Sequence, residues 1–145
     1  MPSINKTSLV SVPTETMYQV VNTVSAYPEF VEGCSGSKVL EESETRMVAQ
    51  IAVEKAGFSQ TFTTENELVP NQSIHLNLVD GPFKFLRGEW RFEALNDDAC
   101  KVIFNLEFEF KSKLMGMAFN GAFKQVAESM MQSFINRAKQ LSEQG

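Results

Sequence analysis

The chain has 145 residues, of which 43% are hydrophobic and 21% charged. This size and balance predict one globular domain spanning residues 1–145. The 13 basic and 18 acidic residues give a net charge of −5 at pH 7, which argues against a general binder of DNA and against a polybasic membrane anchor. The sequence shows no secretory signal pattern and no apolar stretch near the roughly 20 residues that a transmembrane segment needs. We therefore expect a cytoplasmic protein.

Phenylalanine dominates the aromatic residues, with 12 Phe against 2 Tyr and 1 Trp. So much phenylalanine indicates either a dense core or an apolar cavity. The two cysteines, Cys34 and Cys100, and the single histidine, His75, show no metal-ligand spacing. The sequence therefore predicts no metal site and two reduced, buried cysteines.

The predicted elements begin with a strand near residues 5–11, followed by two short helices. Pro13 suits the first turn of a helix, and apolar residues then recur at helical spacing: Met17, Tyr18, Val21 and Val24. We predict that this helix ends near residues 27–28, because the residue before a proline is disfavoured in a helix. A short helical turn at residues 29–31 follows.

Alternation of apolar and polar residues predicts the next strands, at about residues 37–42, 45–55, 58–68, 74–78, 86–94 and 101–111. In the last of them one face is apolar: Val102, Phe104, Leu106, Phe108 and Phe110. Short turns such as residues 96–98 join the strands. With the first strand, this pattern indicates about seven strands in an antiparallel meander.

The last predicted element is a long helix from about Leu114 to Leu141. Its apolar face is formed at i+3 and i+4 steps by Phe119, Phe123, Val126, Met130, Phe134, Ala138 and Leu141. A helix this one-sided must lie across the apolar face of the sheet. The predicted fold class is therefore α+β, a helix-grip fold in which a curved antiparallel sheet wraps around a long C-terminal helix.

Between sheet and helix there is either a filled core or a cavity for a hydrophobic ligand, and the pattern alone fits both. The lining predicted from strand parity and helical spacing is almost wholly apolar: Phe62, Leu78, Trp90, Phe104, Leu106, Phe108, Met130 and Phe134. Gly116 and Gly121 weaken the first turns of the last helix, which indicates either a movable gate or an irregular helix start.

Residues for conventional catalysis are scarce. His75 is predicted to point outward, without a cysteine or serine partner at catalytic spacing. The predicted pocket has only Thr64 or Asn66 at its edge, and no acid–base pair accompanies them. The sequence therefore predicts no catalytic residues and favours a binding protein over an enzyme.

Four segments, in order, resemble the ribosome association toxin RatA family. They are residues 27–34 (YPEFVEGC), residues 62–66 (FTTEN), residues 80–92 with DGPFK and GxWxF, and residues 134–139 with FxxRAK. This family is similar to the mitochondrial coenzyme Q-binding proteins within the START-like, polyketide-cyclase-like superfamily. The resemblance covers essentially the whole chain and agrees with the helix-grip prediction.

The resemblance implies a protein that binds the large ribosomal subunit and inhibits its joining to the small one, and it allows an antitoxin partner. The alternative that it implies is a ubiquinone or lipid carrier supporting respiration, with a small hydrophobic ligand and no required cofactor. By position, the resemblance places six residues at the cavity mouth: Tyr27, Pro28, Phe30, Asp80, Pro82 and Phe83. Met117, from the start of the last helix, is predicted beside them.

Some charged residues oppose a ribosomal role and others favour it. Glu65 stands where we expect a basic residue in RatA-like members, and Glu32 stands where a proline is common. Both add negative charge to a chain that is already acidic, and nucleic-acid phosphates favour lysine and arginine. Lys111, Lys113 and Lys124 either form a local basic contact patch or are a solvated helix face. Contact with a ribosomal protein would remove the conflict.

Overall fold

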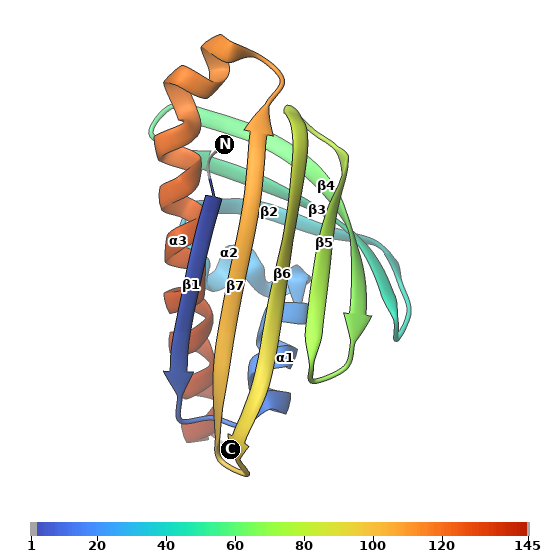
Figure 1. Ribbon diagram of the computed structural model, residues 1–145, viewed down its shortest axis with the longest axis vertical. Helices are drawn as coiled ribbons and strands as arrows, with labels where there is room; N and C mark the ends of the chain where they lie inside the picture. The colour runs from blue at the N-terminus through green and yellow to red at the C-terminus, as the bar shows by residue number, and fades with distance from the viewer. Residues whose placement is uncertain (1–2, 145) are drawn as a thin grey trace.

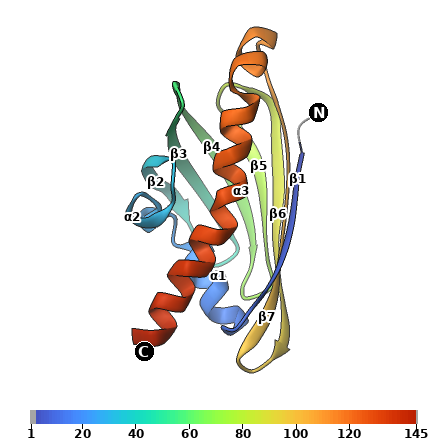
Figure 2. The same cartoon turned by 90° about the vertical axis from the view of Figure 1, so that its left-hand side faces the viewer.

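Seven strands form one antiparallel sheet that curves around a long helix (Figures 1 and 2). The structure, a computed structural model, describes residues 3–144. The strands are β1 (Ser3–Val10), β2 (Cys34–Glu42), β3 (Arg46–Lys55), β4 (Phe58–Val69), β5 (Ser73–Asp80), β6 (Phe83–Asn96) and β7 (Ala99–Phe110). Their order is β1-β7-β6-β5-β4-β3-β2, and α3 (Lys113–Gln144) crosses one face. The predicted α+β helix-grip fold is confirmed.

Two short helices connect β1 to β2, as predicted, but their boundary differs. Helix α1 (Thr14–Asn22) ends five residues before Tyr27, and a 3-10 turn, η1 (Val24–Ala26), separates it from α2 (Tyr27–Phe30). Thr23 ends α1, since its side-chain Oγ1 donates a hydrogen bond to the Gln19 carbonyl at 2.6 Å. Pro28 lies in the first turn of α2, where a missing N–H is no loss. The proline therefore marks a helix start and not a helix end.

The inward face of β7 is as predicted: Val102, Phe104, Leu106, Phe108 and Phe110 are all at most 5% exposed. On α3 the predicted apolar stripe is buried at Phe123, Phe134 and Ala138. Leu141 is 41% exposed, because it borders a surface groove beside α1 and not the sheet. The stripe is therefore buried as far as Ala138.

The phenylalanine-rich core divides into two aromatic clusters along α3. The Trp90 cluster contains Tyr27, Phe30, Trp90, Phe104 and Phe134. The Phe83 cluster contains Phe58, Phe62, Phe83, Phe108, Phe110, Phe119 and Phe123. Each cluster joins α3 to the sheet: Phe134 lies edge-on to Trp90 with ring centroids 5.2 Å apart, and Phe123 lies edge-on to Phe108 at 4.7 Å.

Two glycines make a matched test of this packing. Gly81 has φ +150°, and a Cβ added there would lie 2.7 Å from the Phe62 Cβ and 3.3 Å from its Cα. Gly121 is exposed in α3, with nothing within 4 Å of an added Cβ. We expect Gly81→Ala to lower the free energy of unfolding by about 1–3 kcal/mol, and Gly121→Ala to raise it by about 0.5–1 kcal/mol. Urea denaturation followed by circular dichroism measures both, and equal effects would contradict the packing.

Candidate functional site

An internal cavity lies between the sheet and α3. Its wall includes Tyr27, Trp90 and Phe104 of the Trp90 cluster together with Phe62 and Phe123 of the Phe83 cluster, so the cavity occupies the space between the two clusters. The centres of water-sized molecules can occupy about 70 Å³ of it. A single buried water needs about 10–15 Å³ on this measure. The cavity is therefore large enough for several waters or for part of a small organic ligand.

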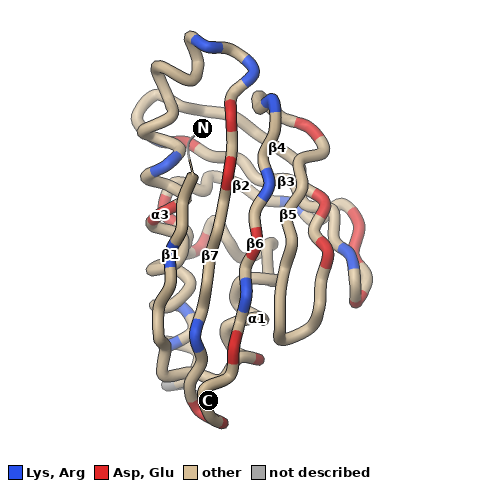
Figure 3. The backbone as a smooth tube through the Cα atoms, viewed as in Figure 1, with Lys and Arg blue, Asp and Glu red and all other residues tan. Residues whose placement is uncertain are grey.

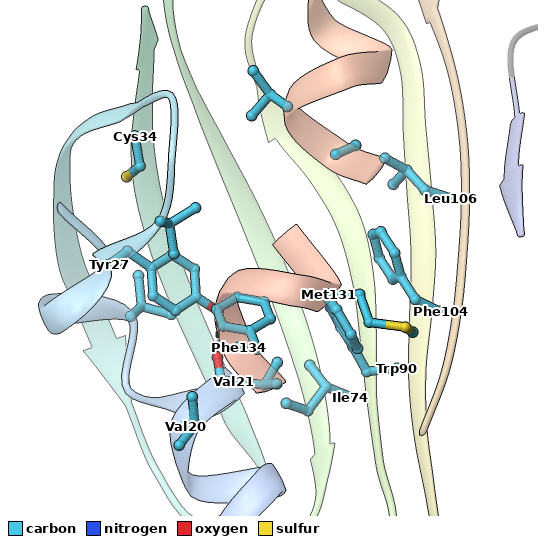
Figure 4. Close-up of a cluster of buried hydrophobic side chains, with 14 of the residues drawn as sticks. Val20, Val21, Tyr27, Cys34, Ile74, Trp90, Phe104, Leu106, Met131 and Phe134 are labelled. Carbon is cyan, nitrogen blue, oxygen red and sulfur yellow. Dashed lines mark hydrogen bonds between the residues drawn. The ribbon is translucent and has the colours of Figure 1, made fainter. Parts of the chain in front are cut away.

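Five of the eight residues predicted to line a cavity are on this wall: Phe62, Trp90, Phe104, Leu106 and Met130. The structure places the other three elsewhere. Phe134 packs between Tyr27 and Trp90, with centroid distances of 5.1 Å and 5.2 Å (Figure 4). Phe108 packs against Phe123 and Phe83, and Leu78 lies near Gly81. Strand parity identifies the inward face but not the depth at which packing leaves space.

The wall also carries a small polar group of residues. Thr64 and Asn66, on β4, are 4% and 5% exposed, and the Thr64 Oγ1 donates a hydrogen bond to the Asn66 Oδ1 at 2.8 Å. Asn22, the last residue of α1, also lines the cavity. Its buried Oδ1 has no hydrogen-bond partner within the described residues. Sequence reasoning missed Asn22 because it extended α1 beyond this residue.

Tyr27, Pro28 and Phe30, predicted at the cavity mouth, lie in α2 beside the middle of α3. Tyr27 is buried and its hydroxyl donates a hydrogen bond to the Val21 carbonyl, while burial raises the pKa of the Tyr27 phenol. Phe30 is half-buried, and the Arg137 guanidinium lies 5.3 Å from its ring centroid. Pro28 is exposed. Only Tyr27 of these three contacts the cavity.

The other predicted mouth residues gather near the β5–β6 turn and the start of α3. Phe83 is 1% exposed, inside its aromatic cluster, whereas Met117 is 84% exposed. Asp80 is exposed, and the Pro82 carbonyl accepts a hydrogen bond from the Lys111 amide at 3.0 Å. Phe30 contacts Phe134 of α3. Met117 lies 17 positions before Phe134 in the same helix, which is a distance of about 25 Å along the helix axis. The seven residues therefore do not form one opening.

Several basic residues lie close together along the chain where β7 leads into α3 (Figure 3). Lys84, Lys111 and Lys113 border one shallow groove, together with Met117. Lys84 pairs with Glu109 at 3.6 Å, and Leu114 beside them is 79% exposed. We call Lys84, Lys111, Lys113, Leu114 and Met117 the α3 entrance face. Lys124, also predicted in the basic patch, lies 11 residues beyond Lys113, about 17 Å along the helix, and outside this groove.

Other chemistry is limited in the part of the chain that the structure describes. The His75 imidazole contacts the Glu89 carboxylate on the neighbouring strand. No group of three or more His, Cys, Asp or Glu side chains there could hold a metal ion. No helix there is long and apolar enough to cross a membrane.

Residues 10–135, most of the chain, match the family described as polyketide cyclase / dehydrase and lipid transport. The chain belongs to this family. It is 51% identical over 141 residues to the ribosome association toxin RatA of Escherichia coli (strain K12), a match that covers 97% of this chain and 89% of the relative. It is 30% identical to the mitochondrial coenzyme Q-binding protein COQ10 of Drosophila melanogaster, over 94% of this chain and 58% of the relative. The predicted family resemblance is confirmed.

Solved structures show the same fold. The Zhui aromatase/cyclase from Streptomyces sp. R1128 superposes with a TM-score of 0.83 at 18% identity, covering 95% of this chain and 93% of that one. A START superfamily protein from Mycobacterium smegmatis gives a TM-score of 0.80 at 22% identity, covering 96% and 98%. At these identities the similarity establishes the START-like fold alone.

The two cysteines give a prediction about reactivity. Cys34 lies on the cavity wall, and Cys100 is 0% exposed at the start of β7. Burial raises the pKa of both thiols, so each carries less reactive thiolate at neutral pH than free cysteine does. We expect both to react with Ellman's reagent at pH 7.5 at least about tenfold more slowly than free cysteine until urea unfolds the chain. Rapid labelling of either thiol in the folded protein would contradict the structure.

Proposed function

We propose that the protein acts in the cytoplasm by binding the large ribosomal subunit and inhibiting its joining to the small subunit. The observation that carries this proposal is the 51% identity, over 97% of the chain, to a relative named a ribosome association toxin. Binding is favoured over catalysis because the described residues of the cavity wall include no carboxylate or imidazole. The wall's titratable side chains, Tyr27 and Cys34, have pKa values that burial raises, which makes them poor general bases at neutral pH.

The acidic residues that depart from the expected family pattern have cationic partners of their own. Arg46 donates hydrogen bonds to the Glu65 carboxylate from Nε at 2.9 Å and from Nη2 at 2.6 Å. Lys55 bonds the Glu32 carboxylate at 2.5 Å, and this bond lowers the pKa of Glu32. Both acidic groups therefore lie beside compensating positive charge, which weakens the electrostatic objection to a ribosomal partner.

The α3 entrance face is the surface that we assign to the ribosomal contact. This face combines three lysines with two strongly exposed apolar side chains, Leu114 and Met117, and the lysine charges can approach RNA phosphates. The apolar pair can be buried against a ribosomal protein. Lys111 and Lys113 form no ion pair that would compete for them within the described residues. This combination fits a ribosomal surface where protein and RNA meet.

Sucrose gradients of bacterial ribosomes test the proposal. Added wild-type protein is expected to raise the ratio of free subunits to assembled ribosomes. The double variant Lys111→Glu/Lys113→Glu is expected to lose at least about two thirds of this effect, because lysine contacts to phosphate carry salt-dependent affinity. Lys38→Glu/Lys139→Glu changes the net charge equally at other sites and is the matched control.

Two outcomes of the gradients would contradict the proposal. An unchanged subunit ratio with wild-type protein would contradict the ribosomal function itself. Equal loss in both double variants would contradict the assignment of the α3 entrance face, because the effect would then depend on total charge alone.

The cavity supports a second candidate function, a carrier of ubiquinone or of another hydrophobic ligand. The relative named a coenzyme Q-binding protein shares 30% identity over 94% of this chain. The present space of about 70 Å³ is less than half of the ~150 Å³ engineered cavity that holds benzene, so a quinone ring requires the cavity to widen. Met130 on the wall has the flexible side chain that such widening needs, and Gly116 and Gly121 weaken the start of α3.

Cysteine labelling tests this carrier function. A ubiquinone analogue with a short side chain is expected to slow the labelling of Cys34, which lines the cavity, at least about threefold at saturation, by excluding the reagent. Cys100 is not on the cavity wall and is expected to slow only as far as a bound ligand stabilises the folded chain, so it serves as the internal control. Mass spectrometry of the labelled peptides measures each rate. Slowing of Cys34 that does not exceed that of Cys100 would contradict a ligand that covers Cys34 in this cavity.

A further inference from the structure

The polar part of the otherwise apolar cavity wall is made by three side chains, Asn22, Thr64 and Asn66. Asn22 is the last residue of α1. The residue before it, Val21, also lines the cavity, as does Ile74 of β5 (Figure 4). Asn66 on β4 is paired with Leu76, two residues along β5 from Ile74. The fold therefore places Asn22 of α1 and Thr64 and Asn66 of β4 on the wall of one cavity.

These groups offer both halves of a hydrogen-bonding pair. The Asn22 Oδ1 is a buried acceptor without a donor within the described residues, an arrangement that folded proteins rarely tolerate. The Asn66 Oδ1 already accepts a hydrogen bond from Thr64, so its Nδ2 is the donor of that side chain. An occupant of this space is best satisfied when it donates to Asn22 and accepts from Asn66.

We propose that this part of the cavity binds the hydroxyl group of a small aromatic ligand, a phenol or a hydroquinone. A hydroxyl both donates and accepts, whereas the carbonyl of a quinone only accepts and a hydrocarbon does neither. The aromatic side chains of Phe62, Trp90 and Phe104 provide the apolar surface for the ring. This inference rests on the carrier function proposed above and specifies its ligand as the reduced, hydroxyl-bearing form.

Three one-ring probes separate the contribution of hydrogen-bond donation to ligand binding from the contribution of the apolar ring. 4-Methylphenol and anisole are isomers of equal size, but the ether oxygen of anisole cannot donate; toluene has no oxygen. Trp90 is the single tryptophan and lies on the cavity wall, so its indole N–H gives one NMR signal that reports binding to the intact protein. We expect 4-methylphenol to bind about tenfold more tightly than anisole, the effect of one buried hydrogen bond to an otherwise unsatisfied acceptor.

A variant identifies the residue responsible. Asn22→Leu preserves side-chain size and removes the acceptor, and it is expected to abolish the preference for 4-methylphenol while toluene still binds. Asn77→Leu, at an exposed position of β5 outside the cavity, is the control and is expected to keep the preference. The ranking of the three probes on wild-type protein tests the proposal even where Asn22→Leu does not fold.

The outcomes distinguish this inference from the carrier function. Equal binding of 4-methylphenol and anisole to wild-type protein, or a preference that survives in Asn22→Leu, would overturn the hydroxyl assignment and leave an apolar ligand site. Binding of none of the three probes would show that water alone occupies the polar part, and would overturn both the inference and the carrier function.

Discussion

Helix α3 is held on the sheet at two separate places by aromatic side chains, and the rest of the structure depends on these contacts. Near the middle of the helix, Phe134 meets Trp90, which in turn stacks on Phe104 with centroids 4.1 Å apart. Nearer its start, Phe123 meets Phe83 and Phe108. Protein interiors are normally close-packed, with few voids larger than a water molecule, so unfilled space between these two contacts is a departure from ordinary packing. The cavity is the space that remains between them.

The two candidate functions use different parts of the same helix. The inner side of α3, at Phe123, Val126 and Met130, forms the cavity wall. Its exposed start carries Lys113, Leu114 and Met117 at the surface that we assign to the ribosome. A net charge of −5 does not prevent such a contact, because charge acts locally over about 8 Å at physiological ionic strength, and Glu32 and Glu65 are paired with cations.

The fold could be predicted from the sequence because it rests on periodicity. Alternation over β7 and the long apolar stripe of α3 leave one arrangement of sheet and helix that buries both. The cavity could be predicted only in part. Parity identified Phe104 and Leu106 correctly as inward, but Phe108 faces inward too and is packed against Phe123, a contact between a strand and a helix that strand parity does not describe. The prediction that the first helix ends at the residue before Pro28 was also wrong, because α2 begins at Tyr27. The predicted helix therefore ran past Asn22, and the sequence did not identify Asn22 as a residue of the cavity wall.

Cryo-electron microscopy of the large ribosomal subunit incubated with this protein tests the central claim most directly. We expect density for the seven-stranded sheet and α3 at the surface that meets the small subunit, with Lys111, Lys113, Leu114 and Met117 turned toward the ribosome. Subunits without added density at saturating protein, or protein bound through the β2–β3 hairpin with the start of α3 in solvent, would contradict it.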